Sequence, residues 1–329
     1  GLPGSPSAAL KVKGAGPLAD FAADVALITD GVDRLAGKVT LTGQQDGATA
    51  FGAVLAGDLA PLFLPEYAEF FGNAVSLTTK GQRWPDGRLD LAALGLTAKA
   101  LHLNGALLLA ADGLPQRFHL TGQIAAPDGS AVLLPLTTEQ PVKVDRAELT
   151  LGYDATQGEG WSADVALSGL NRPDFRASTL QIVGSGRIAR VAGARQVGAT
   201  LRFTAEGLEP TDAAAARALG TVVWGDAIGY WREGDGSVTL SRMNVAGDGY
   251  AAFVSGTVSG LADALELSGR ATAKVADLSR LSGVAGQPLA GAAEIALQGK
   301  GSPITGAFDL EGSAKGQDMR VGVAEVDNL

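Results

Sequence analysis

Apolar and polar residues alternate along most of this chain. Clear examples are Leu101-His102-Leu103-Asn104, Phe118-His119-Leu120-Thr121 and Leu201-Arg202-Phe203-Thr204. A period of two places neighbouring side chains on opposite faces of a β-sheet. One apolar and one polar face is typical of antiparallel sheets that meet water on one side only. The pattern therefore predicts an all-β, antiparallel protein.

Turn signals separate the alternating runs. Asp-Gly pairs readily adopt the positive φ angles of tight hairpin turns. They occur at Asp30-Gly31, Asp46-Gly47, Asp86-Gly87, Asp112-Gly113, Asp128-Gly129, Asp235-Gly236 and Asp248-Gly249. With strands recurring every ~8–12 residues between such turns, we expect roughly 16 to 18 strands.

Only three segments carry a helical signal. Short helices are predicted at Leu62–Phe71, Pro210–Leu219 and Asp277–Ser282. In the second, Thr211 or Asp212 can cap the N-terminus and Gly220 ends the helix. Three short helices are too few to cover the apolar face of a sheet of this length. We therefore expect a long antiparallel sheet that is curled into an elongated, taco-like groove with a few short helices.

The inner wall of this groove is predicted to be apolar and to contact lipid. Its candidate residues occupy the apolar positions of the alternating runs: Leu101, Leu103, Phe118, Leu120, Val142, Val144, Leu149, Leu151, Val165, Leu167, Leu201, Phe203, Val238, Leu240, Leu265, Leu267, Phe308 and Leu310. The alternative is that the same residues form a dry core between two packed sheets, which is the commoner arrangement.

Weak internal repetition indicates how the chain is organised. Asp58-Leu59-Ala60-Pro61-Leu62 and Asp277-Leu278-Ser279-Arg280-Leu281 are both short helix entries that precede a new strand. Their unequal spacing fits a stack in which each hairpin packs on its neighbours, and it does not fit a propeller. We expect residues 1–329 to form one elongated groove segment of irregular hairpin repeats. The expected sub-repeat boundaries lie near 57–73, 207–221 and 277–291.

Composition narrows the classes of function. The chain has 329 residues, 46% hydrophobic and 19% charged, and a formal net charge of −9. The acidic balance argues against a nucleic-acid binder, which would carry a basic face. The absence of cysteine excludes disulfides and thiolate metal sites. No apolar run reaches the ~18 residues of a membrane-spanning helix, and the N-terminus does not resemble a signal peptide. We expect an interior piece of a longer protein.

No residue pattern predicts an enzyme. His102 and His119 could face each other across a hairpin as two metal ligands, but outward, solvated side chains are the commoner outcome. Gly184-Ser185-Gly186 is not a nucleophile elbow. Glu206 and Glu209 precede a predicted helix, where acidic residues more often serve capping and solvation than glycosidase chemistry. We expect no catalytic residue, no cofactor and no metal.

Three aromatic residues follow the predicted Ala-rich helix. Trp224, Tyr230 and Trp231 could pack this helix against the sheet. The alternative is that they form a rim of the groove or a patch that contacts lipid.

Three stretches of the chain resemble the TamB family, the inner-membrane part of the translocation and assembly module. They are Gly14–Leu27, Gly57–Gly72 and Asp277–Pro303. The last has the Asp-Leu-x-x-Leu…Gly-x-x-Leu-x-Gly rhythm that is common to TamB and AsmA-like proteins. The resemblance covers essentially the whole chain.

The resemblance implies a location and partners. Such proteins are anchored in the inner membrane and cross the periplasm of diderm bacteria, so this chain would be tethered by a segment that its sequence does not include. The implied function is an apolar groove for phospholipid transport between the two membranes, together with outer-membrane protein assembly and translocation. The implied partners are phospholipid acyl chains and an Omp85-type outer-membrane partner (TamA), which would bind outside this chain.

Two alternatives stay open. In the first, the protein is a scaffold or chaperone with a closed, dry core that guides outer-membrane β-barrel strands by pairing along a sheet edge. In the second, it is a secreted, adhesin-like β-solenoid, and the resemblance is spurious.

Overall fold

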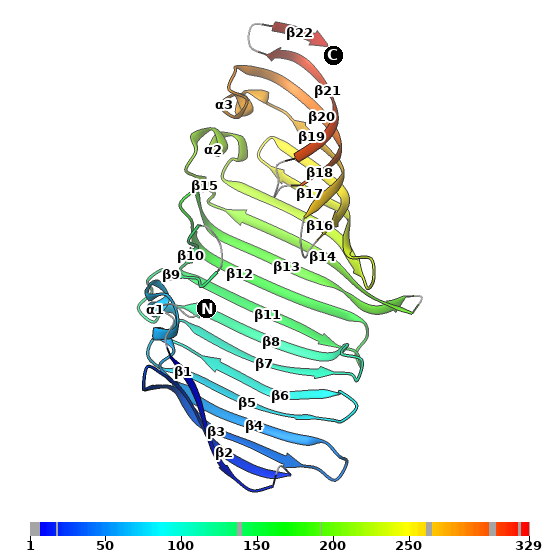
Figure 1. Ribbon diagram of the computed structural model, residues 1–329. Helices are drawn as coiled ribbons and strands as arrows, with labels where there is room; N and C mark the ends of the chain where they lie inside the picture. The colour runs from blue at the N-terminus through cyan, green and yellow to red at the C-terminus, as the bar shows by residue number, and fades with distance from the viewer. Residues whose placement is uncertain are drawn as a thin grey trace. The chain divides into compact units, whose positions relative to one another are not determined.

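The computed structural model describes residues 7–17, 19–136, 140–191, 193–260, 265–302, 307–321 and 324–328 (Figure 1). Strand makes up 68% and helix 8% of the structure, which confirms the all-β prediction. Contacts divide the chain into two compact units, Gly1–Gly158 with Ala163–Leu170 and Glu159–Ser162 with Asn171–Leu329. A single elongated segment over residues 1–329 stays a prediction.

The first unit is an antiparallel sheet whose strands pair almost entirely in chain order. Each strand from β1 to β8 pairs with the next, and β8 then pairs with β11. The bounds are β1 (Ala8–Ala15), β2 (Asp20–Thr29), β3 (Val32–Gly43), β4 (Thr49–Gly57), β5 (Val75–Arg83), β6 (Leu89–Thr97), β7 (Leu101–Leu109), β8 (Pro115–Ala125) and β11 (Arg146–Asp154). Between β8 and β11, β9 (Val132–Leu133) pairs with β10 (Lys143–Val144).

The second unit repeats this design. Strands β13, β14 and β16 to β22 pair in chain order, and β15 also pairs with β13. The bounds are β13 (Phe175–Val191), β14 (Ala194–Glu206), β15 (Glu209–Pro210), β16 (Val222–Arg232), β17 (Ser237–Gly247), β18 (Tyr250–Ser259), β19 (Glu266–Val275), β20 (Leu289–Ser302), β21 (Ala307–Val321) and β22 (Ala324–Asn328). Strand β12 (Gly160–Asn171) contributes residues to both units.

The described strands are more numerous than the sequence predicts. They number 22, against roughly 16 to 18 expected from turn spacing. Three of them, β9, β10 and β15, have two residues each. Alternation needs about four residues to be recognisable, so such short strands escape a search for period two.

Short helices form in all three places where they are predicted. The first place holds η1 (Ala60–Leu62), η2 (Pro65–Tyr67) and α1 (Ala68–Phe71), and the third holds η3 (Leu278–Leu281) and α3 (Ser282–Ala285). The second holds α2 (Ala213–Leu219). Of its two predicted caps, Asp212 is the one used, because its side chain accepts from the Ala215 N–H at 2.7 Å. Gly220 ends the helix.

The Asp-Gly turns form as the sequence predicts. All seven glycines have φ between 61° and 98°, a region that glycine adopts without a steric penalty. In several turns the aspartate also accepts from the backbone two residues later, as Asp46 does from the Ala48 N–H at 3.1 Å. This local bond fixes the hairpin and hence the register of its strands.

Buried side chains gather under the short helices. In the first unit, Phe70 of α1 packs with Ala100 and Val132. In the second, Leu278 of η3 packs with Val275 and other residues at the same end of the strands. In the described parts of the chain, the helices therefore cover the apolar face at one end of the strands.

Among the residues that the structure describes, no second layer covers the rest of the apolar face within either unit. The chain exposes 19023 Å², whereas two compact units that share this mass would together expose ~15,200 Å². The sheet is also not closed on itself. These observations confirm a long, open antiparallel sheet with a few short helices, and they do not support a sandwich of two packed layers in either unit.

Candidate functional site

Strand register in the first unit places six of the candidate residues on one face. Leu101 pairs with Ile124, and Leu103 and Leu149 both pair with Gly122. Leu120 pairs with Leu151, and Phe118 pairs with Tyr153 at 5.6 Å between ring centroids. Paired residues share a face, so alternation in three separate strands produces one continuous apolar surface.

The second unit has the same arrangement. Leu201 and Phe203 of β14 pair with Ala227 and Gly225 of β16. Ala227 then pairs with Met243 of β17. The sequence-predicted residues on β14 therefore share a face with the apolar residues of β17 and the strands that follow it.

On this face, strands β17 to β21 form an apolar groove with a volume of about 300 Å³. Four of the predicted residues line it: Leu240, Leu267, Phe308 and Leu310. Sequence reasoning missed Val254, Val258 and Leu297, which also line it. Alternation could have identified these three residues, because each occupies an apolar position of an alternating run.

A row of glycines forms the floor of the groove. Gly256, Gly269 and Gly299 pair in succession across β18, β19 and β20, between Leu240 on one side and Leu310 on the other. A Cβ on Gly269 would collide with the Ser255 carbonyl oxygen. The glycines therefore allow close approach of the strands and leave the space above them empty. The groove lies above these glycines, and the larger side chains of Leu240 and Leu310 stand on either side of it.

Two predicted residues do not line an open surface. Val142 is 9% exposed and Val144 is fully buried at 0%. Val144 pairs with Val132, which belongs to the core under α1. The prediction of an open groove wall at these two positions is wrong, because a helix covers this end of the sheet.

The remaining predicted residues lie outside the groove of β17 to β21. Val238 is half-buried and shares the apolar face, opposite Val258. Leu265 is half-buried and precedes β19 by one residue. Val165 and Leu167 are half-buried in β12.

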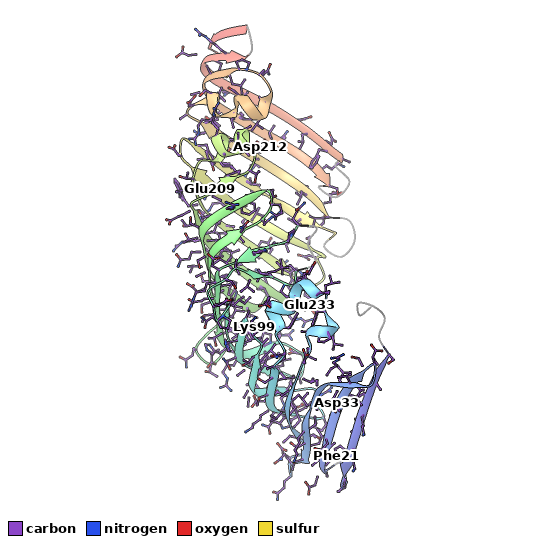
Figure 2. The ribbon with its side chains drawn as sticks, turned by 90° about the vertical axis from the view of Figure 1, so that its left-hand side faces the viewer. Phe21, Asp33, Lys99, Glu209, Asp212 and Glu233 are labelled. Carbon is purple, nitrogen blue, oxygen red and sulfur yellow. The ribbon has the colours of Figure 1, made fainter. Side chains whose placement is uncertain are left out.

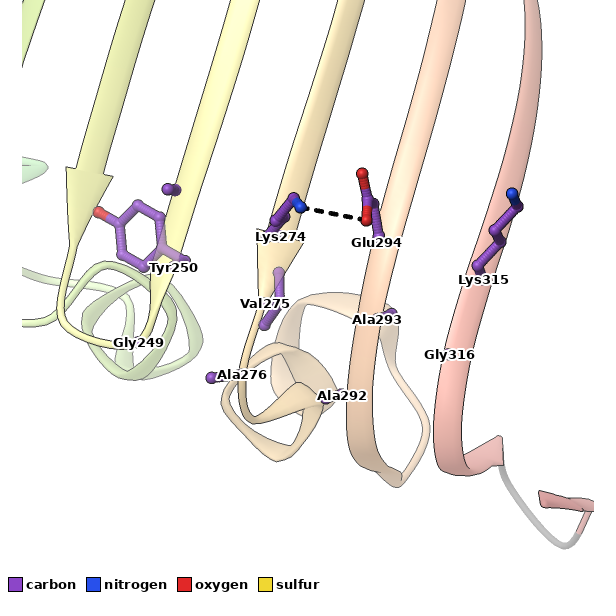
Figure 3. A pocket seen from close by; sticks show the side chains of 11 residues that line it. Gly249, Tyr250, Lys274, Val275, Ala276, Ala292, Ala293, Glu294, Lys315 and Gly316 are labelled. Atoms are coloured by element: carbon purple, nitrogen blue, oxygen red, sulfur yellow. Dashed lines mark ion pairs between the residues drawn. The ribbon is translucent and has the colours of Figure 1, made fainter. Parts of the chain in front are cut away.

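The opposite face is polar and carries ion pairs. Arg242 lies 2.8 Å from Asp226, and Lys274 lies 3.3 Å from Glu294 (Figure 3). The second pair borders a shallow hollow of about 650 Å³ at the helix-bearing end of the strands. These exposed pairs each contribute little to stability, about 0–1 kcal/mol, but they keep this face in water.

The histidines are not placed as a metal site. His102 pairs with Gln123, and His119 pairs with Ala106. Both side chains are exposed on the polar face and do not oppose each other across the hairpin. In the parts of the chain that the structure describes, no three His, Asp or Glu side chains form a group that could hold a metal ion.

The three aromatic residues after α2 do not form one cluster. Trp231 pairs with Val238 on the apolar face, whereas Tyr230 pairs with Thr239 on the polar face. Trp224 is also on the polar face and is exposed. A different aromatic residue, Tyr250, contacts α2: its hydroxyl donates to the Leu219 carbonyl at 3.3 Å. Of these three residues, Trp231 alone lies on the apolar face, where a groove rim would be.

Comparison with known proteins does not identify a family for this chain. No protein-family model, curated protein or solved structure matches the chain. Among the helices of the described residues, none has the length and apolar character needed to cross a bilayer. The resemblance to the TamB family therefore stays a prediction.

Proposed function

We propose that this protein binds phospholipid acyl chains along its apolar face, as a non-enzymatic conduit between the inner and outer membranes of a diderm bacterium. The proposal places the chain in the periplasm, tethered to the inner membrane by a segment outside this sequence. It also includes a role in outer-membrane protein assembly with an Omp85-type partner. These details follow from the resemblance to the TamB family.

One observation carries the lipid proposal. The groove of β17 to β21 has an apolar lining and stays open above its glycine floor. Each CH₂ group that is moved from water into such a groove is stabilised by about 0.8 kcal/mol. Acyl chains therefore gain from lying in the groove, and their polar head groups can remain in water.

The test compares two substitutions at matched exposure. Leu297 of the groove and Val183, on the polar face opposite Arg202, are both 42% exposed. Purified Leu297→Glu should bind phosphatidylglycerol at least about tenfold more weakly in native mass spectrometry, because a carboxylate is costly beside an acyl chain. Val183→Glu should bind as the wild type does. Equal binding by both variants and the wild type would refute the lipid groove.

A second function is favoured by the first strand. All eight residues of β1 are exposed, including Leu10 at 68% and Val12 at 53%. Among the described strands, β1 pairs with β2 alone. A strand at a sheet edge presents unpaired backbone groups that can accept another strand. In this alternative, the edge guides outer-membrane β-strands. A photo-crosslinker at Leu10 should then capture nascent barrel protein, and its absence there, with lipid captured at Leu297, would exclude this role.

A further inference from the structure

The edge strand β1 carries positive charge at its polar positions. Leu10 and Val12 alternate with Lys11 and Lys13, and all four residues are exposed. β1 contains no acidic residue, although the whole chain has a net charge of −9. Within the described part of the chain, no ion pair includes either lysine. The edge strand is therefore cationic in an acidic protein.

Strand register assigns these side chains to opposite faces of the sheet. Val12 pairs with Val25 of β2, and the same row continues from strand to strand as far as Leu103 on the apolar face. Leu10 lies two residues from Val12 and shares this face. Lys11 and Lys13 therefore lie on the polar face.

An aromatic ring extends the apolar side of this edge. A Cβ on Gly14 of β1 would collide with the ring of Phe21, so this ring lies over Gly14 (Phe21 is labelled in Figure 2). Directly opposite residues on paired strands have Cβ atoms about 4.5–5.5 Å apart. A strand added beside β1 would therefore meet apolar side chains on this face.

The polar side of the edge has little negative charge within the sheet. Among the residues of β2 that pair with β1, Asp24 is the only charged one. It lies opposite Lys13, and on its other side it pairs with Lys38 of β3. Lys11 pairs with Ala26. Two lysines therefore share one aspartate, and Lys11 has no opposite charge directly across the strand pair.

The lysines act against pairing of β1 with the β1 of a second copy. In the two longest antiparallel overlaps that keep the apolar positions on one face, Lys11 would lie opposite Lys11 or Lys13 of the other copy. Like charges directly opposite each other destabilise a strand pair, and lysine on an edge strand commonly prevents edge-to-edge association. A strand with acidic residues at the same positions would be attracted instead.

We infer that β1 binds a β-strand of another protein in which acidic residues alternate with apolar ones; this inference rests on the second proposed function, strand addition at this edge. The backbone of the added strand pairs with that of β1. Its apolar side chains contact Leu10 and Val12. Its carboxylates lie opposite Lys11 and Lys13, where opposite charges stabilise the pairing. The edge therefore selects acidic strands from basic strands that have the same apolar pattern.

The experiment measures binding of two synthetic peptides to the full chain by fluorescence anisotropy. The peptides share their Leu and Val positions, and the polar positions are Glu in one and Lys in the other. The wild type should bind the Glu peptide at least about fivefold more tightly, and a photo-crosslinker at Leu10 should capture it. Lys11→Glu combined with Lys13→Glu should reverse the preference.

The matched control is Lys80→Glu combined with Lys143→Glu. It changes the net charge by the same amount at two exposed lysines. Their strands, β5 and β10, are each paired on both sides. This control should keep the wild-type preference.

Several results would overturn the inference. One is equal binding of both peptides by the wild type, which would mean strand addition without selection by charge. Others are a preference that persists in the variant with both β1 lysines reversed, or one that the control loses equally. If that β1 variant does not fold, Lys11→Gln decides, and an unchanged preference there refutes the inference. If neither peptide binds or crosslinks at Leu10, the second proposed function itself fails.

Discussion

At the scale of single residues, glycines on the apolar face determine how closely neighbouring strands approach. Gly269 has no room for a side chain, because a Cβ would collide with the Ser255 carbonyl and lie 2.8 Å from Gly256 Cα. Gly198 is the matched control, since a Cβ there would meet no atom within 4 Å. We expect Gly269→Ala to lower the free energy of unfolding by about 1–3 kcal/mol and Gly198→Ala to change it by less than about 0.5 kcal/mol. Urea unfolding of the two variants measures the difference, and equal values would contradict the close approach.

The same residues show what the sequence could predict. Leu267 and Phe308 were recognisable from alternation alone, because the period of two depends only on neighbours in the chain. The glycine row was not, since only the register of the paired strands places Gly256, Gly269 and Gly299 side by side.

At the scale of elements, the tips of neighbouring hairpins are joined by side chains. Trp84 Nε1, after β5, donates to Asp46 Oδ2, before β4, at 2.9 Å. The pKa of Asp46 lies below the ordinary value of 3.8. The bond from Trp84 has the largest effect, and the bond from the Ala48 N–H has the next largest. A lowered pKa means that the folded state favours the carboxylate, so the stabilisation is present above pH 3.8 and is lost as the pH falls through the lowered pKa.

We therefore expect Trp84→Phe to reduce the melting temperature at pH 7 and to have a smaller effect as the pH falls through the lowered pKa of Asp46, below which Asp46 is protonated in both states. Trp224→Phe, at an exposed tryptophan, serves as control and should keep the pH dependence of the wild type. Thermal melts across this pH range measure both. A Trp84→Phe deficit that does not shrink in acid would show that the bond to Asp46 is not its cause.

Alternation along a strand cannot show whether the apolar face of that strand is open or covered. Val142 and Val144 occupy apolar positions that look the same in sequence as Leu101 and Leu103. The difference is what lies above them, since Val144 pairs with Val132 in the core under α1. Alternation identifies the apolar side of a strand, but whether that side is covered depends on tertiary packing.

At the scale of the whole molecule, the exposed surface predicts an unusual unfolding signature. An unfolded chain of this mass exposes ~48,000 Å², and two compact units that share this mass would bury ~33,000 Å² of it. With 19023 Å² still exposed after folding, only about 29,000 Å² is buried, about one eighth less than two compact units would bury. Heat-capacity change and denaturant dependence both scale with the surface that unfolding exposes.

We therefore expect the summed heat-capacity change of unfolding to fall about one eighth below the ~12–15 cal/mol/K per residue of compact proteins. Calorimetry of the full chain measures it, with the transitions of the two units added together. Bound phospholipid should raise the value, because its acyl chains cover apolar surface that unfolding would expose to water again. Lipid that binds the polar face would leave the value unchanged. A lipid-free chain with the heat-capacity change of a compact protein would mean that the apolar face is already covered by the protein itself, which would leave no open surface for acyl chains.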